Sequence, residues 1–328
     1  MKFLETEISP LGMGCWPIGG KMYCGEQSLG YTRSDDDVSI RTIHAALEGG
    51  ITLFDTAAAY GAGHSERLLG KALKQRPEAL IATKIGVGID EANKQISFDP
   101  FTPDMVAPAV DGCLSRLDRD RIDLLLLHVN DMPIEMAEPV FDELDQLKEA
   151  GKLRAYGWST DYSRSASAVS TRSNFAAVEY VMNLFVDAPR MQRVVQENGL
   201  FSLIRSPLAM GLLSGKYDQN TVMAADDVRA SDEDWMEYYK DGRANPDLIQ
   251  KLDAVRDLLT SNGRTLVQGA LGWIWGQFDT YIPIPGARTE EQIKGIAGAL
   301  TFGALPDDIL NEIEALIPRA PNEPDRPR

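Results

Sequence analysis

Short apolar runs alternate with longer amphipathic stretches along almost the whole 328-residue chain. The later runs are mostly apolar on both faces, as buried parallel strands are: Ile51–Phe54, Leu80–Thr83, Ile122–Leu127, Leu153–Trp158, Ala176–Met182, Phe201–Ile204 and Tyr281–Ile284. A first run lies near Leu11–Trp16. The stretches between them have helical spacing: Asp36–Glu48, Ser65–Leu73, Pro103–Leu117, Glu138–Glu149, Ala188–Glu197, Thr265–Trp275 and Glu290–Leu300. About eight such alternations predict an α/β fold with a single closed (β/α)8 TIM barrel.

A doubly wound open sheet is the structural alternative to the barrel. Such a sheet usually carries a Gly-x-Gly-x-x-Gly fingerprint after its first strand. Gly12 and Gly14 in the first run do not continue into that spacing, so we favour the barrel. We expect one domain over residues 1–319, with active-site loops near 17–35 and 214–245, because long polar excursions in a compact domain are commonly functional. The proline-rich tail, residues 320–328, is expected to be mobile.

Charge and composition argue against several classes of protein. The formal net charge of −16 disfavours nucleic acid as a partner, because a phosphate backbone needs a basic face. The longest purely aliphatic run, Leu124–Leu127, is too short to cross a membrane, and the first residues lack the apolar core of a secretory signal. Three cysteines, Cys15, Cys24 and Cys113, have no metal-like spacing. We therefore expect a reduced, cytoplasmic protein without a metal site.

Ionisable residues follow three consecutive predicted strands. Asp55 follows the strand that ends at Phe54, Lys84 follows the next, and His128 follows the third, while Tyr60 lies in the loop after Asp55. Chemistry in a barrel of this kind takes place at the C-terminal ends of the strands. Each residue also has a structural interpretation, such as a helix cap or an ion-pair partner. We disfavour the interpretation that these four residues meet on one rim by accident.

Together these four side chains fit the reduction of a carbonyl group. A phenol with an ordinary pKa near ~10 is a weak acid at neutral pH, and an ammonium such as Lys84 beside Tyr60 would lower that pKa. Asp55 would hold the lysine, and His128 would orient the substrate oxygen toward Tyr60. A Schiff-base lyase that uses Lys84 as its nucleophile is the alternative. The source of hydride decides between the two.

Several segments carry a resemblance to a known family, in order along residues 10–300: Leu11–Gly20, Phe54–Gly61, His64–Leu73, Ala82–Lys84, Asp123–His128, Gly151–Arg154, Arg205–Tyr217 and Ile284–Arg288. On these segments the chain resembles the aldo-keto reductases. The resemblance implies a barrel with a nicotinamide cofactor across its C-terminal mouth, NADPH or NADP, with NADH as the alternative. It also implies the catalytic tetrad Asp55, Tyr60, Lys84 and His128, with Tyr60 as proton donor and no metal. The implied partner is a small-molecule carbonyl substrate.

The cofactor contacts that the resemblance implies include three departures from the family pattern. The family usually has Ser-Asn after the fifth strand to hold the carboxamide, and here the pair is Ser159 and Thr160. Glu179 stands where a glutamine is common, and an ionised carboxylate would accept from the carboxamide NH2. Arg205 stands where an aromatic residue usually stacks on the nicotinamide. Its charge would favour the reduced, neutral ring.

The phosphates of the cofactor are expected at two later segments. The loop Ser206–Lys216 resembles the segment that covers the pyrophosphate in this family, and we single out its residues Ser206, Leu208, Gly211, Ser214 and Lys216. After the eighth strand, the residues implied are Gly286, Arg288 and Gln292. Arg288 would clamp the 2′-phosphate of NADPH, since arginine binds phosphate bidentately. Ile296 stands where an asparagine often holds adenine.

The substrate is the least specified part of the site. Trp16 is expected to form a wall of the pocket, with Tyr60 and His128 contacting the carbonyl oxygen. Further candidates for the lining are Met22, Tyr23, Tyr31, Asn130 and Trp235–Tyr239. A mixed polar and apolar lining would suit an uncharged aldehyde or ketone. The family also includes subunits that sense the cofactor and bind a partner, which is a further functional alternative, and the sequence leaves the oligomeric state open.

Overall fold

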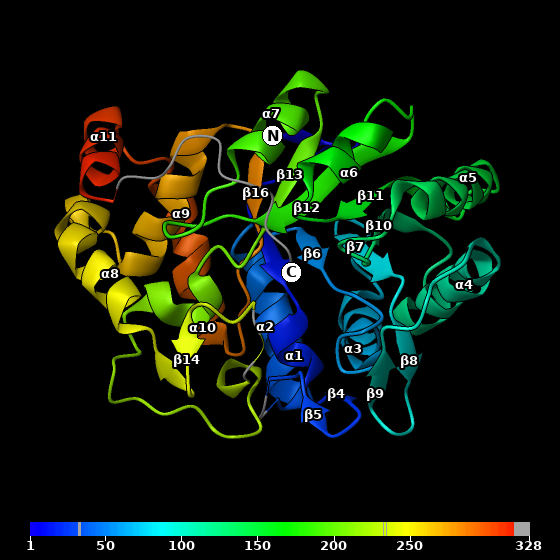
Figure 1. The fold of residues 1–328 in the computed structure, drawn as a ribbon, viewed down its shortest axis with the longest axis horizontal. Coiled ribbons are helices and arrows are strands. Elements are labelled where there is room, and N and C mark those ends of the chain that lie inside the picture. The colour runs from blue at the N-terminus through cyan, green and yellow to red at the C-terminus, as the bar shows by residue number, and fades with distance from the viewer. Residues whose placement is uncertain (32–33, 232, 234, 318–328) are drawn as a thin grey trace.

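The computed structural model describes residues 1–31, 34–231, 233 and 235–317. One sheet contains eight strands, whose order in space follows their order in the chain (Figure 1). They are β3 (Gly12–Gly14), β6 (Leu53–Asp55), β7 (Leu80–Ile85), β10 (Ile122–Leu127), β11 (Leu153–Ser159), β12 (Phe175–Val181), β13 (Phe201–Arg205) and β16 (Tyr281–Pro283). All neighbours in this sheet pair in parallel. The predicted (β/α)8 barrel is confirmed.

The barrel closes where its first and last strands meet. Gly14 forms a parallel bridge with Gly286, and its amide donates to the carbonyl of Pro285 at 3.0 Å. A Cβ atom on Gly14 would lie 2.6 Å from the carbonyl oxygen of Ile284, so only glycine lets the two backbones approach this closely. The closure places the end of β3 beside the segment that follows β16.

Side chains fill the barrel interior, and a short hairpin covers one end. Leu124 and Leu126 of β10 belong to the inner cluster, while Leu125 and Leu127 belong to the outer cluster that contains the helix residues, as the period of two in a strand requires. The hairpin β1 (Lys2–Phe3) and β2 (Thr6–Glu7) was not predicted. Its Phe3 is fully buried and packs edge-on against Phe201.

Helices surround the sheet, and most lie in the stretches that the spacing predicts (Figure 1). They are α1 (Trp16–Gly19), α2 (Asp36–Glu48), α3 (His64–Leu73), α4 (Val106–Leu117), α5 (Ile134–Glu149), α6 (Ser163–Val169), α7 (Pro189–Glu197), α8 (Pro246–Leu259), α9 (Leu266–Gln277), α10 (Glu290–Ala297) and α11 (Asp307–Leu316). Short 3-10 turns occupy Pro103–Met105, Ala209–Ser214, Val228–Ala230, Ser261–Gly263 and Gly298–Thr301. No helix among the described residues has the length and apolar character needed to cross a membrane.

Two excursions extend the barrel beyond its core units. The segment after β3 forms β4 (Tyr23–Cys24) and β5 (Gln27–Ser28), which join β8 (Gly88–Asp90) and β9 (Gln95–Ser97) in a four-stranded sheet (Figure 1). The second excursion contains β14 (Tyr239–Lys240) and β15 (Arg243–Ala244). The two predicted loops contact each other, because the amide of Val228 donates to the carbonyl of Gly30 at 3.1 Å.

Candidate active site

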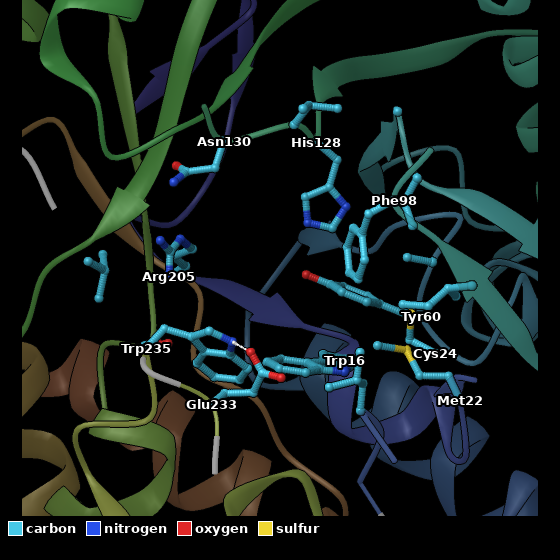
Figure 2. Close-up of a pocket in the computed structure, with 18 of the residues that line it drawn as sticks. Trp16, Met22, Cys24, Tyr60, Phe98, His128, Asn130, Arg205, Glu233 and Trp235 are labelled. Carbon is cyan, nitrogen blue, oxygen red and sulfur yellow. Dashed lines mark hydrogen bonds between the residues drawn. The ribbon is translucent and has the colours of Figure 1, made fainter. Parts of the chain in front are cut away.

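Two cavities meet at the C-terminal ends of the strands. The first has a volume of about 550 Å³ and is lined by aromatic and polar side chains (Figure 2). The second, of about 420 Å³, runs from the end of β6 to the segment after β16. Five residues line both cavities: Trp16, Tyr60, Arg205, Ser206 and Met210. A ligand in one cavity can therefore contact a ligand in the other at this junction.

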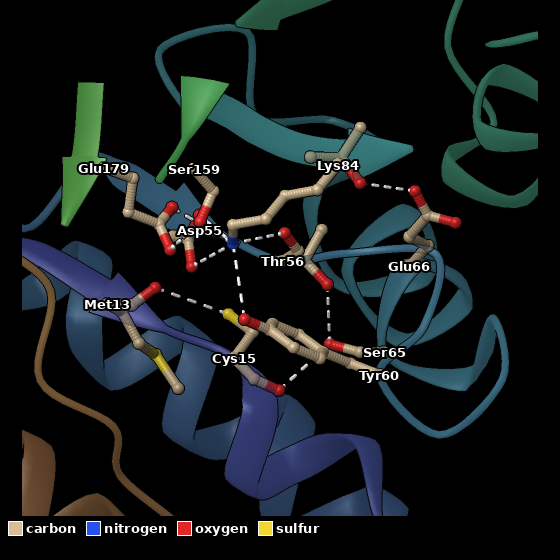
Figure 3. A network of polar contacts seen from close by, with 11 residues as sticks. Met13, Cys15, Asp55, Thr56, Tyr60, Ser65, Glu66, Lys84, Ser159 and Glu179 are labelled. Atoms are coloured by element: carbon tan, nitrogen blue, oxygen red, sulfur yellow. Dashed lines mark hydrogen bonds and ion pairs between the residues drawn. The ribbon is translucent and has the colours of Figure 1, made fainter. Parts of the chain in front are cut away.

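Lys84 lies at the centre of a buried polar cluster beneath the junction (Figure 3). Its ammonium nitrogen Nζ donates to Asp55 Oδ1 at 2.6 Å and Oδ2 at 2.8 Å. It also donates to the carbonyl of Thr56 at 2.9 Å and to the hydroxyl of Tyr60 at 3.3 Å. The Lys84 side chain is wholly buried. Three of the four predicted tetrad residues are thus joined by direct hydrogen bonds.

The loop after β6 presents Tyr60 to this cluster. Gly61 and Gly63 have φ angles of 63° and 86°, which glycine adopts without steric cost. A Cβ on Gly61 would lie 2.0 Å from the carbonyl oxygen of Gly19, so the loop packs directly on α1. Trp16, the first residue of α1, stacks on the Tyr60 ring at 5.8 Å between centroids and 14° between planes. These contacts fix the direction of the phenol.

His128 completes the group from the end of β10. Its backbone amide donates to the carbonyl of Ile85 at 2.7 Å, which continues the pairing of β10 with β7. The imidazole lies edge-on to the Tyr60 ring, with 6.0 Å between ring centroids. Both side chains line the first cavity and point toward its centre (Figure 2). The four residues that the strand ends predicted therefore lie together.

The charges of the cluster keep the lysine protonated. Burial alone lowers the pKa of Lys84, but the carboxylates of Asp55 and Glu179 and the hydroxyl of Tyr60 raise it well above its ordinary value. Burial and the neighbouring Glu179 carboxylate raise the pKa of Asp55, and these effects outweigh the lowering by Lys84. Glu179 Oε2 lies 3.2 Å from Lys84 Nζ. The sequence did not predict this second carboxylate on the lysine.

The second cavity collects the residues that were predicted to bind the phosphates of a cofactor. Its lining includes Ser206, Leu208, Gly211, Ser214, Lys216, Gly286, Arg288 and Gln292. Within the loop, Met210 and Gly211 have φ angles of 52° and 97°, so the backbone turns sharply over the cavity. The Gln292 side chain accepts from the backbone amide of Arg288 at 2.8 Å. Ile296 also lines this cavity.

Arg205 lines both cavities, but its charge does not stand alone. Its guanidinium pairs with the carboxylate of Asp161. Asp161 is 8% exposed, and its Oδ1 accepts from the amide of Val181 at 2.9 Å. The predicted preference for a neutral nicotinamide rested on the charge of Arg205, and the Asp161 carboxylate pairs with that charge.

Ser159 and Thr160 are not among the residues that line either cavity. The Thr160 hydroxyl donates to the carbonyl of Asn130 at 2.6 Å, and the Ser159 hydroxyl donates to Glu179 Oε1 at 3.3 Å. Both residues are buried and orient other parts of the site. Both hydroxyls therefore donate to other parts of the protein, and their contact with a carboxamide, which the resemblance implies, stays a prediction.

The first cavity contains residues that the sequence did not single out. Ile96 of β9 and Phe98, which directly follows β9, line it together with Trp235. Among the predicted candidates, Met22 and Asn130 line this cavity, whereas Tyr23 lines neither and Tyr31 lines the second. The sequence did not predict the β8–β9 hairpin, because its strands are short and polar.

Arg229 is a further residue of the second cavity that the sequence did not single out. It forms hydrogen bonds with both carboxylate oxygens of Asp227, at 2.8 and 2.9 Å. Its guanidinium also lies over the rings of Tyr31, Tyr217 and Tyr239, at 5.4, 5.1 and 5.8 Å from their centroids. This cluster joins the two long loops beside the cavity, and only the folded chain brings its members together.

Comparisons with known proteins agree with this arrangement. The sequence model of the aldo/keto reductase family matches residues 10–318. The chain is 30% identical to the aldo-keto reductase YhdN of Bacillus subtilis, over 97% of this chain and 92% of that protein. It is 28% identical to the aldo-keto reductase yakc [NADP(+)] of Schizosaccharomyces pombe, over 95% of this chain and 89% of that protein.

A solved structure is similar over nearly the whole chain. The glycerol dehydrogenase AKR11B4 of Gluconobacter oxydans superimposes with a TM-score of 0.77 and 30% sequence identity, and the match covers 99% of this chain and 96% of that one. The barrel, the arrangement of strand-end residues and the family match over residues 10–318 agree. The chain belongs to the aldo/keto reductase family.

Proposed function

We propose that this protein reduces an aldehyde or ketone to the alcohol, reversibly, with NADPH as the hydride donor and Tyr60 as the proton donor. The observation that carries the proposal is the position of the Tyr60 hydroxyl. It lies 3.3 Å from Lys84 Nζ, and Tyr60 lines both cavities. A carbonyl in the first cavity and a nicotinamide in the second would therefore meet at the phenol.

The residues of the second cavity fit a dinucleotide phosphate. Arg288 supplies a guanidinium for the 2′-phosphate, and the loop Ser206–Lys216 turns over the cavity where a pyrophosphate would lie. Glu179 Oε2 is buried and accepts no hydrogen bond among the described residues, so a carboxamide NH2 would supply the donor that this oxygen lacks. When bound, the reduced nicotinamide supplies the hydride.

The roles of the tetrad follow from its bonds. The Lys84 ammonium stabilises negative charge on Tyr60 oxygen and so eases loss of the phenolic proton to the substrate. Asp55 holds Lys84 in place by two short contacts and favours its charged form. His128 lines the first cavity beside Tyr60, where its ring would orient the carbonyl oxygen.

The lining of the first cavity supports an uncharged substrate. Aromatic side chains form much of its wall, and the carboxylates of Asp99, Asp131 and Glu233 lie among them. The guanidinium of Arg205, which also lines this cavity, is paired with Asp161. An anionic substrate would meet an excess of negative charge there. A neutral aldehyde or ketone with an apolar body would meet no such repulsion.

The Schiff-base alternative is not supported by the environment of Lys84. A nucleophilic lysine needs a neutral amine, whereas Asp55 and Glu179 favour the ammonium. The wholly buried Nζ is also surrounded by oxygen acceptors. The comparisons favour neither this alternative nor a cofactor-sensing interaction subunit. NADH remains the alternative cofactor, and the relative named for NADP(+) supports NADPH.

We also propose that residues 1–319 form one domain whose loops near 17–35 and 214–245 serve the active site. The bond between Val228 and Gly30 and the lining of both cavities support this role. Residues 318 and 319 and the predicted mobile tail, 320–328, lie outside the described residues. A cytoplasmic location is part of the proposal, and three free cysteines support a reducing compartment.

Cofactor fluorescence and turnover test the proposed function. NADPH is titrated into the protein, and the decay of NADPH absorbance is then followed with a panel of neutral and anionic aldehydes and ketones. The proposal predicts saturable binding of NADPH and turnover that is faster with the neutral members. Binding without turnover would overturn the catalytic proposal, and an absence of NADPH binding would overturn the assignment of the second cavity.

A further inference from the structure

Two carboxylates share one buried ammonium in this site. The side chains of Lys84, Asp55 and Glu179 are exposed by only 0%, 3% and 1%. They come from β7, β6 and β12, and β12 is not a neighbour of either other strand in the sheet, so they meet across the barrel interior. With both carboxylates ionised, the cluster would carry one uncompensated negative charge. Burying such a charge is costly unless a proton or another cation compensates it.

The hydrogen atoms of Lys84 are already used by other acceptors. An ammonium has three N–H groups, and here they serve the Asp55 carboxylate, the carbonyl of Thr56 and the hydroxyl of Tyr60. Among the described residues, Glu179 Oε2 lies 3.2 Å from Nζ without accepting a hydrogen bond from it, and Glu179 Oε1 accepts from Ser159. Glu179 is therefore attracted to the lysine without sharing one of its hydrogens.

Four further titratable or charged groups lie around the cluster. Tyr60, in the loop after β6, and Cys15, after β3, carry no positive charge in either protonation state, and burial raises the pKa of the Cys15 thiol. His128 follows β10 and lies beside Tyr60. Arg205 of β13 is paired with Asp161. Glu179 also raises the pKa of Asp55, in the direction expected for two carboxyls that share a proton.

We propose that Asp55 and Glu179 hold one proton between them in the free protein and with NADPH, and that the binding of NADP+ releases it. The proposal rests on the proposed function, which places the nicotinamide beside Tyr60. Both carboxyls line the second cavity, so the ring would lie against them. The oxidised ring carries a positive charge that can replace the proton, whereas the reduced ring is neutral. The balance is protein–H plus NADP+ giving protein–NADP+ plus H+.

This proton exchange makes cofactor discrimination depend on pH. Below the pKa of the shared proton, NADP+ must displace it in order to bind, so its affinity falls as the pH falls. NADPH keeps the proton, so its affinity does not carry this dependence. The ratio of the two dissociation constants should approach a tenfold change per pH unit, because one proton is linked to binding. Glu179→Gln would leave the charges of Lys84 and Asp55 balanced, and it would remove the linkage between cofactor binding and proton release.

Calorimetric titration in two buffers of different ionisation enthalpy counts the protons exchanged. The wild-type protein should release about one more proton with NADP+ than with NADPH at low pH. Protons exchanged at the 2′-phosphate cancel in this difference, because both cofactors carry that group. In Glu179→Gln the difference should fall near zero. The matched control is Glu291→Gln, which removes another carboxylate that lines the same cavity and should keep the wild-type difference.

The outcomes separate this inference from the proposed function. Equal proton counts for the two cofactors in the wild-type protein, or an undiminished difference in Glu179→Gln, would overturn the proton linkage while leaving the reductase in place. Failure of either cofactor to bind would overturn the proposed function, and the linkage with it. If Glu179→Gln does not fold, the ratio of the NADP+ and NADPH dissociation constants of the wild-type protein is measured at several pH values. A ratio that does not change with pH overturns the inference.

Discussion

The guanidinium of Arg205 is paired with the buried carboxylate of Asp161, and this pair lies where the two cavities meet. Asp161 is held in turn by the amide of Val181, and its own amide donates to the side chain of Asn130 at 2.7 Å. A flat guanidinium can still stack on a nicotinamide ring. Because the pair is neutral as a whole, it presents this surface with little net charge.

Replacing Asp161 by Asn should uncover the charge of Arg205. The amide keeps an oxygen that can accept from Val181 but removes the negative charge. An unpaired guanidinium beside the oxidised ring would weaken NADP+ relative to NADPH by about 1 kcal/mol, or roughly fivefold in the ratio of dissociation constants. Fluorescence titrations with both cofactors measure that ratio. An unchanged ratio would show that the pairing does not control the local charge.

Lys84 should be a major determinant of stability as well as of catalysis. Lys84→Met leaves Asp55 and Glu179 buried without their cation, and removing one partner of a buried ion pair typically costs about 3–5 kcal/mol. The free energy of unfolding in urea should fall by that amount. Adding Asp55→Asn and Glu179→Gln should recover most of the loss. A triple variant as unstable as the single variant would contradict this electrostatic explanation.

The Asp227–Arg229 pair should stabilise the protein in a pH-dependent way. Burial raises the pKa of Asp227, but hydrogen bonds and the charge of Arg229 lower it below the ordinary value on balance. The stability that ionised Asp227 contributes is therefore present above about pH 4 and is lost as the pH falls through the lowered pKa. Asp227→Asn should cost about 1.5–3 kcal/mol at neutral pH.

Unfolding experiments at several pH values test the direction in which the contribution of Asp227 to stability changes with pH. The difference in free energy of unfolding between the wild type and Asp227→Asn should be largest at neutral pH and should shrink below about pH 4. A difference that grows on acidification would contradict the role given to the carboxylate. Tyr217, whose hydroxyl accepts from Arg229 at 2.9 Å, offers a matched comparison, because Tyr217→Phe breaks a hydrogen bond whose two partners do not titrate in the acidic range. Its effect should not change over the acidic range.

Arg288 should decide between the two nicotinamide cofactors. Arg288→Ala removes the guanidinium proposed to bind the 2′-phosphate, and a charged hydrogen bond of this kind is worth about 1.5–3 kcal/mol. The NADPH dissociation constant should therefore rise by roughly 10- to 100-fold, with a much smaller change for NADH. Titration of NADPH and NADH into the wild-type protein and into Arg288→Ala measures these dissociation constants. Equal losses for NADPH and NADH would place the 2′-phosphate elsewhere.

The sequence predicted those parts of the fold in which local pattern and burial agree. Apart from Asp123, the run Ile122–Leu127 is apolar on both faces, and it forms β10 with the predicted bounds. Asp36–Glu48 also has its predicted bounds, because Asp35 caps the helix by accepting from the amide of Val38. Helices α1, α6, α8 and α11 were not predicted, although Asn245 and Pro246 form a helix-start signal before α8.

The candidate site shows where prediction from the sequence stops. Strand ends placed Asp55, Lys84 and His128 on one rim, because a closed parallel sheet aligns such positions. The contact of Glu179 with Lys84 depends on which side chains meet across the barrel interior, and no local spacing encodes it. Asp161 and Arg205 are likewise 44 positions apart and meet only through the pairing of β12 with β13 and the segment after β11.

The most direct test of the central claim is the rate of carbonyl reduction by Tyr60→Phe, measured together with NADPH affinity. The change removes one hydroxyl from the contact with Lys84 and little volume. We expect a loss in kcat of about 10²- to 10⁴-fold, as for removal of a general acid, with a dissociation constant for NADPH near the wild-type value. Near-normal turnover by Tyr60→Phe would contradict the assignment of Tyr60 as proton donor.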